Sequence, residues 1–178
     1  MARGASLLRA GLLGTATLAM TLAGCSKPGE APKADASAAS AAAGPAVEGT
    51  FYGNGAPGML NYVAAYPDEP LDGKPVTAIV LTARDQRGHA HPTSDAVYGK
   101  LGDAIVAKVE PDGALIGVEV VNSGLQSPSG SISLSGVVSL KDYRAEAGTI
   151  SGRLTSGGDV DVFGQKLQID VTFRTKSP

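Results

Sequence analysis

The clearest pattern in the chain is a strict alternation of apolar and polar residues near its C-terminus. Over Lys166–Arg174 every second side chain is apolar, and the side chains between them are polar or charged. Such period-two alternation predicts a half-buried β-strand. Residues 131–140 alternate in the same way, except at Val137, and Thr149–Thr155 repeats the pattern. We therefore expect three strands in the C-terminal third of the chain.

A β-hairpin is predicted upstream of these strands. The β-rich segments Asp103–Val109 and Ala114–Val121 flank the sequence Glu110-Pro111-Asp112-Gly113. Proline presets φ at the second position of a turn, and glycine accepts a positive φ at the fourth. Two further strands are expected over Phe51–Asn54 and Met59–Tyr66.

The segment Val76–Ala83 is apolar on both faces, which favours a strand in the middle of a sheet. Pro92–Gly102 is expected to hold one helical turn, capped by Thr93 or Ser94. About eight short strands and no long helix predict an all-β fold. We expect a single domain over residues 47–178, either an antiparallel β-sandwich or a small barrel.

Composition agrees with short strands and tight turns, since the 178 residues include 24 glycines and no tryptophan. The formal charge is −2, and loss of residues 1–24 would remove Arg3 and Arg9 but no acid, leaving about −4. A mildly acidic surface argues against a nucleic-acid partner, which requires a basic one.

The N-terminus has the three parts of an export signal. Arg3 and Arg9 give a positive start, and Ala10–Leu22 is uncharged and apolar. This stretch is too short to cross a bilayer, which takes about 20 residues. It ends in Leu22-Ala23-Gly24-Cys25, and Cys25 is the only cysteine of the chain. The arrangement predicts a cleaved signal peptide over residues 1–24.

Leu22-Ala23-Gly24-Cys25 resembles the lipobox of bacterial lipoproteins. The resemblance implies cleavage before Cys25, a diacylglycerol thioether on its sulfur and an acyl group on its new amine. Two or three acyl chains anchor a protein stably in a lipid bilayer. Ser26 follows the cysteine, whereas in enterobacteria an aspartate at that place retains lipoproteins in the inner membrane. The resemblance therefore implies sorting to the outer membrane, and we expect the domain to face the periplasm. In a cell with a single membrane the protein would instead lie on its outer face. The alternative is an ordinary signal peptide that leaves Cys25 as a free thiol.

The lipidated Cys25 and the residues up to 46 are predicted to form a disordered tether. The stretch from residue 27 contains only alanine, serine, proline, glycine and a few charges, so it offers no large apolar side chain to bury. A flexible chain of this length spans about 25 Å. We expect it to hold the domain clear of the lipid surface.

His89 and His91 are the only histidines and stand two residues apart. On an extended segment their rings would point to the same side, where Asp85 or Asp95 would add a third ligand for copper or zinc. The alternative is a pair of solvated histidines in a loop.

Acidic residues gather at two other places. Asp68, Glu69 and Asp72 lie in a segment that we expect to be a proline-bounded loop, and Asp159 and Asp161 alternate near a glycine pair. Such oxygens can bind Ca²⁺, although no EF-hand spacing is present. Solvated turn residues are the alternative for both groups.

No motif for catalysis stands out. The chain has no G-x-S-x-G elbow and no glycine-rich phosphate loop followed by a long helix. Tyrosines that can contact a sugar are present, although packing explains them as well: Tyr52, Tyr62, Tyr66, Tyr98 and Tyr143.

We therefore expect a membrane-anchored, non-catalytic binding or scaffolding module that holds an envelope protein or glycan, with no cofactor besides its lipid. One alternative is a periplasmic metal-binding protein that uses His89 and His91. Another is an inhibitor of a cell-wall hydrolase that presents Asp85–Asp95 as its loop. A small hydrolase is a further alternative, because catalytic residues can assemble from distant parts of a chain.

Overall fold

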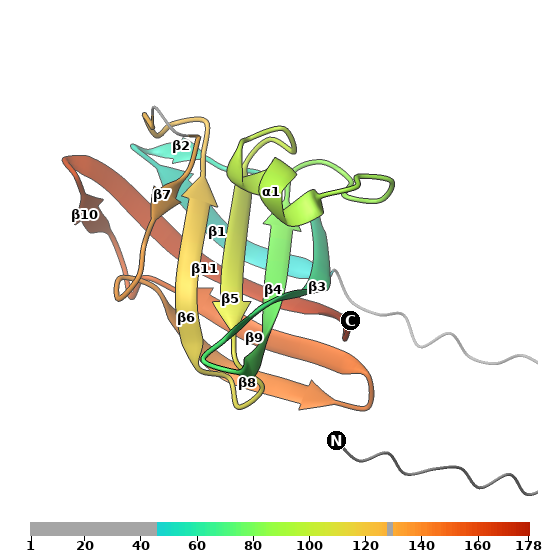
Figure 1. Ribbon diagram of the computed structural model, residues 1–178. Coiled ribbons are helices and arrows are strands. Elements are labelled where there is room, and N and C mark those ends of the chain that lie inside the picture. The colour runs from blue at the N-terminus through green and yellow to red at the C-terminus, as the bar shows by residue number, and fades with distance from the viewer. Residues whose placement is uncertain (1–45, 128–129) are drawn as a thin grey trace, which may run out of the picture. The chain divides into compact units, whose positions relative to one another are not determined.

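The computed structural model of the protein describes residues 46–127 and 130–178, which form two antiparallel sheets packed face to face (Figure 1). Within these residues the first sheet has six strands in the order β2-β1-β11-β9-β8, with β10 beside β11. Its strands are β1 (Val47–Gly53), β2 (Ala56–Pro57), β8 (Ser139–Glu146), β9 (Thr149–Thr155), β10 (Val160–Val162) and β11 (Gln165–Lys176).

The second sheet has five strands in the order β3-β4-β5-β6-β7. Its strands are β3 (Tyr62–Leu71), β4 (Lys74–Thr82), β5 (Ala104–Val109), β6 (Leu115–Val121) and β7 (Ile132–Ser133). One short helix, α1 (Pro92–Val97), connects β4 to β5 and covers the outer face of this sheet (Figure 1). Two separate sheets confirm the expected all-β fold and give it the form of a sandwich.

The main hydrophobic core lies between the sheets and follows the alternation seen in the sequence. On β11 the residues Leu167, Ile169, Val171 and Phe173 are buried, and the polar residues between them face outward. They pack against Ile79, Leu81, Ile105, Val118, Val120, Ile150 and Leu154. The strand expected over Lys166–Arg174 is thus confirmed, and burial of this face is the main favourable term in folding.

The strand β4 is apolar on both sides because both faces of its sheet are covered. Ile79 and Leu81 face the main core, whereas Ala78 and Val80 face α1. A second, smaller core forms there from Ala78, Val80, Ala96, Leu101, Ala104 and Val106. The central position predicted for Val76–Ala83 is confirmed.

The predicted hairpin between β5 and β6 is also confirmed. The Gly113 amide donates to the Glu110 carbonyl at 2.9 Å, and the Glu110 amide donates to the Ala114 carbonyl at 2.9 Å. Gly113 has φ of +90°, the conformation that glycine accepts without strain.

The prediction of a single strand over residues 131–140 is wrong. β7 ends at Ser133, a turn follows in which the Val137 amide donates to the Leu134 carbonyl at 3.0 Å, and β8 starts at Ser139. Gly136, with φ of +82°, lies in this turn. The alternation persists because Leu134 and Val138 both enter the core, but the chain passes from one sheet to the other between them.

The prediction of a proline-bounded loop around Asp68–Asp72 is wrong as well. β3 begins at Tyr62, later than expected, and continues to Leu71. The turn to β4 is confined to Asp72 and Gly73, whose φ values are +51° and +78°. Prolines are tolerated because β3 is an edge strand, where one side of the backbone needs no partner.

The helical turn of α1 is present, but its expected caps, Thr93 and Ser94, lie inside the helix. His91 occupies the N-cap position and Pro92 follows as the first helical residue, a position at which proline is well suited. The helices among residues 46–127 and 130–178 are too short or too polar to cross a membrane. The expected signal peptide, Cys25 and nearly all of the expected tether lie outside the described residues.

Candidate functional site

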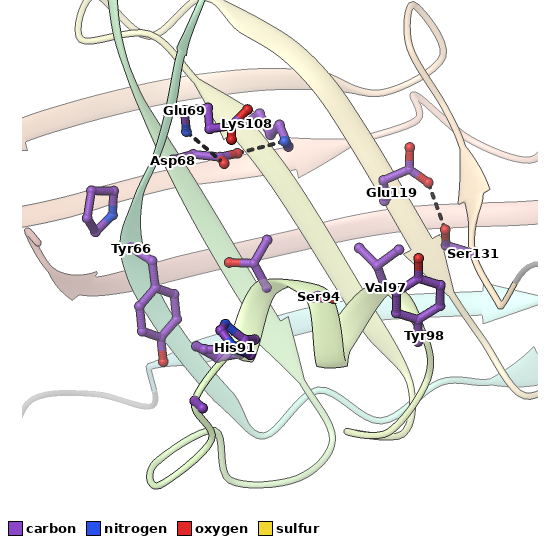
Figure 2. A pocket seen from close by; sticks show the side chains of 14 residues that line it. Tyr66, Asp68, Glu69, His91, Ser94, Val97, Tyr98, Lys108, Glu119 and Ser131 are labelled. Carbon is purple, nitrogen blue, oxygen red and sulfur yellow. Dashed lines mark hydrogen bonds and ion pairs between the residues drawn. The ribbon is translucent and has the colours of Figure 1, made fainter.

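A pocket lies on the outer face of the five-stranded sheet, beside α1 (Figure 2). We call it the outer pocket, and its volume is about 900 Å³. Residues 66–69 of β3 form one side, and residues 90–94 with Val97 and Tyr98 form the other. Lys108, Glu119 and Ser131 complete its lining from β5, β6 and the segment before β7.

Strand register places the polar residues of the pocket on one face. Tyr66 pairs with Ala78, and Ala78 pairs with Lys108, so these three residues form a row across β3, β4 and β5. In the next row Val106 pairs with Glu119. Because alternate residues of a strand share a face, Lys108 and Glu119 lie on the same side as the apolar residues that α1 covers.

An ion pair crosses one wall of the pocket. Lys108 Nζ lies 2.7 Å from Asp68 Oδ2, and the Glu69 amide donates to Asp68 Oδ1 at 2.9 Å (Figure 2). Burial by itself would raise the pKa of Asp68, but the hydrogen bonds and the positive charge of Lys108 outweigh it and hold the pKa below its usual value. Asp68 is therefore a carboxylate at neutral pH.

A second polar contact lies across the pocket from this pair. The Ser131 hydroxyl donates to Glu119 Oε2 at 2.9 Å, and the Ser127 hydroxyl donates to the Ser131 carbonyl at 2.7 Å. Since Lys108 is already paired with Asp68, Glu69 and Glu119 leave the pocket with an excess of negative charge.

Two tyrosines stand on opposite sides of the pocket (Figure 2). Tyr98 follows α1 and its side chain is 65% exposed. Tyr66 is half-buried on β3, and burial raises the pKa of its hydroxyl, with a smaller contribution from the charge of Asp85. The Tyr66 hydroxyl therefore stays protonated at neutral pH, and a tyrosine hydroxyl can donate a hydrogen bond.

The two histidines have different surroundings. His91 lines the outer pocket, whereas His89 Nδ1 lies 2.9 Å from Asp95 Oδ2. Lys100 donates to the other oxygen of Asp95 at 2.7 Å. The hydrogen bond from Lys100 lowers the pKa of Asp95 most, and the contact with His89 lowers it further.

Asp85, the other residue considered as a third metal ligand, is paired with Arg87, whose Nε donates to Asp85 Oδ2 at 2.8 Å. These hydrogen bonds lower the pKa of Asp85 to about 2. In the part of the chain that the structure describes, no three or more histidine, cysteine or acidic residues are grouped so as to hold a metal ion. Copper or zinc binding through His89 and His91 stays a prediction.

The remaining acidic candidates do not gather at one site. Asp68 and Glu69 line the outer pocket, and Asp72 is in the β3–β4 turn. Asp161 accepts a hydrogen bond from the Gly164 amide at 2.9 Å and thereby supports the β10–β11 turn, while Asp159 is exposed before β10.

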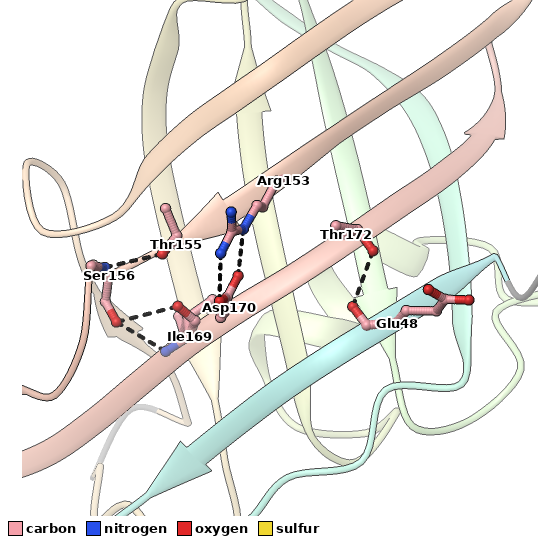
Figure 3. Close-up of polar contacts among 8 residues, drawn as sticks. Glu48, Arg153, Thr155, Ser156, Ile169, Asp170 and Thr172 are labelled. Atoms are coloured by element: carbon pink, nitrogen blue, oxygen red, sulfur yellow. Dashed lines mark hydrogen bonds and ion pairs between the residues drawn. The ribbon is translucent and has the colours of Figure 1, made fainter.

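On the outer face of the six-stranded sheet, polar groups also bind one another (Figure 3). Arg153 donates from Nε to Asp170 Oδ1 at 2.6 Å and from Nη2 to Asp170 Oδ2 at 2.7 Å. The Ser156 hydroxyl accepts the Ile169 amide at 3.0 Å. The Arg153–Asp170 pair connects β9 to β11, and Ser156 connects the segment after β9 to β11.

The sequence analysis missed Lys108, Glu119 and Ser131 as pocket residues. Lys108 and Glu119 could have been found from the sequence, since each is a charged residue within an otherwise apolar strand. Comparison of the chain with protein-family models, with curated proteins and with solved structures finds no match.

Proposed function

We propose that this protein is an exported envelope lipoprotein whose β-domain is a non-catalytic binding module. The lipobox-like sequence Leu22-Ala23-Gly24-Cys25 supports a lipid anchor on Cys25 in the outer membrane. The stretch from Cys25 to residue 46 supports a flexible tether that lets the domain reach partners at some distance from the bilayer. In this proposal the outer pocket is where a partner binds.

The outer pocket is the observation that carries the proposed binding function. Its volume of about 900 Å³ falls within the usual range of ligand sites, roughly 300–1,000 Å³. Lys108, Glu119 and Tyr66 project from three strands of one sheet, and strands position side chains more firmly than loops do. Such a surface can hold a ligand without a conformational change.

The electrostatics of the pocket favour binding over hydrolysis. A carboxyl group that acts as a general acid near neutral pH needs a raised pKa, whereas the pKa of Asp68 is lowered. Glu119 accepts a hydrogen bond from Ser131. Both carboxylates are therefore suited to act as fixed hydrogen-bond acceptors for a ligand.

The anchor is tested by intact mass spectrometry and membrane fractionation of the wild type beside Cys25→Ser. We expect the wild type to be cleaved before Cys25, acylated and bound to membranes, and the variant to lack the lipid and leave the membrane fraction. A wild type that is soluble and unlipidated would overturn the anchor and leave Cys25 as a free thiol.

The binding role of the pocket is tested by placing a photo-crosslinking amino acid at Tyr98 in living cells. Tyr52 is the matched control, since it is an exposed tyrosine on the six-stranded sheet. We expect light-dependent adducts with an envelope component at position 98 and none at position 52. If the variants are membrane-bound and position 98 gives no adduct, the outer pocket is not the binding surface.

A further inference from the structure

The turn between β10 and β11 presents an aromatic ring to solvent. Val162 pairs with Gln165, so Phe163 and Gly164 alone form the turn, with φ of +53° and +76°. Two-residue turns of this kind favour asparagine, aspartate or glycine, because other residues are strained at positive φ. The Phe163 side chain is also 87% exposed, so burial in the domain does not offset the strain. Contact with a ligand would account for phenylalanine at this position.

The surface beside Phe163 is continuous with the outer pocket. A shallow second pocket of about 380 Å³ is lined by Phe163, Gln165, Gln126, Ser133 and others. Ser131 lines both pockets, which places Phe163 at one end of a surface that starts at Tyr66. In the ribbon diagram β7 lies between α1 and β10 (Figure 1).

Hydrogen bonds hold this surface in place between its two ends. Gln165 Nε2 donates to the Gln126 carbonyl at 2.8 Å, and Gln165 Oε1 accepts the Gln126 amide. The start of β11 is thereby attached to Gln126, which lines the second pocket. A ligand that spans both pockets would meet a preformed path, which reduces the entropy cost of binding.

Aromatic rings and hydroxyl or amide groups both line the path. Tyr66, Tyr98 and Phe163 supply rings, and Ser131 and Gln126 lie between Tyr98 and Phe163. A pyranose ring has apolar C–H faces that pack on aromatic rings and hydroxyl edges that need partners able to donate and accept. A chain of sugars therefore matches the path in both respects.

Charge restricts the kind of glycan. Glu69 and Glu119 give the outer pocket an excess of negative charge, because Lys108 is paired with Asp68. Residues 46–178 as a whole carry eleven basic and fifteen acidic side chains. Phosphate, sulfate or carboxylate groups on a ligand would be repelled at this surface.

An extended peptide fits the path less well. Peptides commonly bind a sheet by adding a strand at its edge, where backbone hydrogen bonds supply the affinity. The edge along this path is β7, which has only two residues, Ile132 and Ser133. It offers too few backbone groups for a peptide strand to pair with.

We infer that the outer pocket and the Phe163 turn form one elongated surface that binds a linear glycan without anionic groups. This inference rests on the proposed binding function and adds to it the ligand class and the course of the bound chain. Tyr66 and Tyr98 hold one part of the glycan, and Phe163 contacts a part several sugars away.

The test is isothermal titration of the mature protein in detergent with N-acetylglucosamine oligomers of two and six units. We expect the hexamer to bind about tenfold more tightly than the dimer. Tyr98→Ala should weaken both about tenfold. Phe163→Asn should weaken only the hexamer and leave the melting temperature equal or higher, because asparagine suits the turn. Tyr52→Ala, on the other sheet, is the control and should change neither affinity.

Several results would overturn the inference. Equal affinity for both oligomers, or an unchanged hexamer affinity in Phe163→Asn, would contradict the elongated path. Tighter binding of hexalysine or of an oligogalacturonate would contradict the ligand class. If position 98 forms adducts in cells but neither oligomer binds, the binding function stands and the glycan inference falls. Absence of adducts together with glycan binding in vitro would instead contradict the proposed function in cells.

Discussion

Lys108 Nζ reaches across β4 to lie 2.7 Å from Asp68 Oδ2, joining the middle of the five-stranded sheet to its edge strand. The two residues belong to β5 and β3, which have no backbone contact with each other in the strand order. Asp68 is the less exposed partner, with 19% of its side chain accessible against 43% for Lys108. The pair is thus a side-chain connection between strands that the backbone ladder does not join.

Replacing Lys108 by methionine should lower the free energy of unfolding by about 1 kcal/mol. The aliphatic stem is kept, but Asp68 loses the charge that offsets its partial burial, and the partial exposure of the pair limits the cost. Urea unfolding measures the change. Lys176→Met, at the exposed end of β11, is the control, and equal stability of the two variants would show that the ion pair contributes nothing.

The same pair predicts a dependence of stability on pH. The pKa of Asp68 is lower in the folded protein than its ordinary value of 3.8. Its contribution is therefore fully present above pH 3.8 and is lost as the pH falls through the lower folded value. The stability difference between wild type and Asp68→Asn should stay constant from neutral pH down to about pH 5 and shrink in more acidic solution. A difference that grows on acidification would contradict this account.

Asp103 connects two loops at one end of the sandwich. Its Oδ2 accepts the Met59 amide at 2.9 Å, and its Oδ1 accepts the Ser123 amide at 2.7 Å. Asp103→Ala should cost about 1–3 kcal/mol, because two amides lose their acceptor. Asp103→Asn should cost less, since the amide oxygen keeps one of the two. Thermal unfolding beside Asp159→Ala, an exposed aspartate, tests whether the effect is specific to this position.

Gly58 should tolerate no side chain. A Cβ atom there would lie 2.5 Å from Asn122 Nδ2 and 2.5 Å from Phe51 Cδ1, both in buried residues. Gly58→Ala should therefore lower stability by about 2 kcal/mol through overpacking. Gly117→Ala is the matched control, because a Cβ at that position meets nothing within 4 Å. Similar melting temperatures for the two variants would show that the cluster around Asn122 rearranges easily.

The metal-binding alternative makes a separate prediction for His89 and His91. If both rings bind copper or zinc, His89→Ala and His91→Ala must each weaken binding, and Asp95→Asn must alter it through the contact with His89. Calorimetric titration of the wild type with Cu²⁺ or Zn²⁺ decides the matter. Absence of binding at micromolar metal would reject this alternative.

The fold was predictable wherever one face of a strand meets the core along its whole length. Leu167 to Phe173 alternate because β11 runs between β1 and β9 with a single buried face. The same signal misled over residues 131–140, because Leu134 and Val138 enter the core from the connection between β7 and β8, which belong to different sheets. Alternation reports burial, and it does not report which sheet a residue belongs to.

The outer pocket could not be predicted in the same way. Tyr66 and Lys108 are far apart in sequence, and only the register through Ala78 brings them to one row. The proximity of His89 and Asp95 could be predicted from the sequence, since the two were grouped as candidate ligands. The pairing of Asp95 with Lys100, however, depends on how α1 and the following turn fold back.

The antiparallel pairing of β1 with β11 has a mechanical consequence. Val47, the first residue of β1, lies opposite Phe173, whereas Gly53 lies opposite Leu167, close to the Phe163 turn. Tension between a membrane anchor and a ligand held at that turn would run parallel to both strands. The hydrogen bonds of seven residue pairs would then resist in shear, all at once, instead of opening one after another. If the proposed tether precedes Val47, a pull along it would meet the direction in which the sheet is hardest to separate.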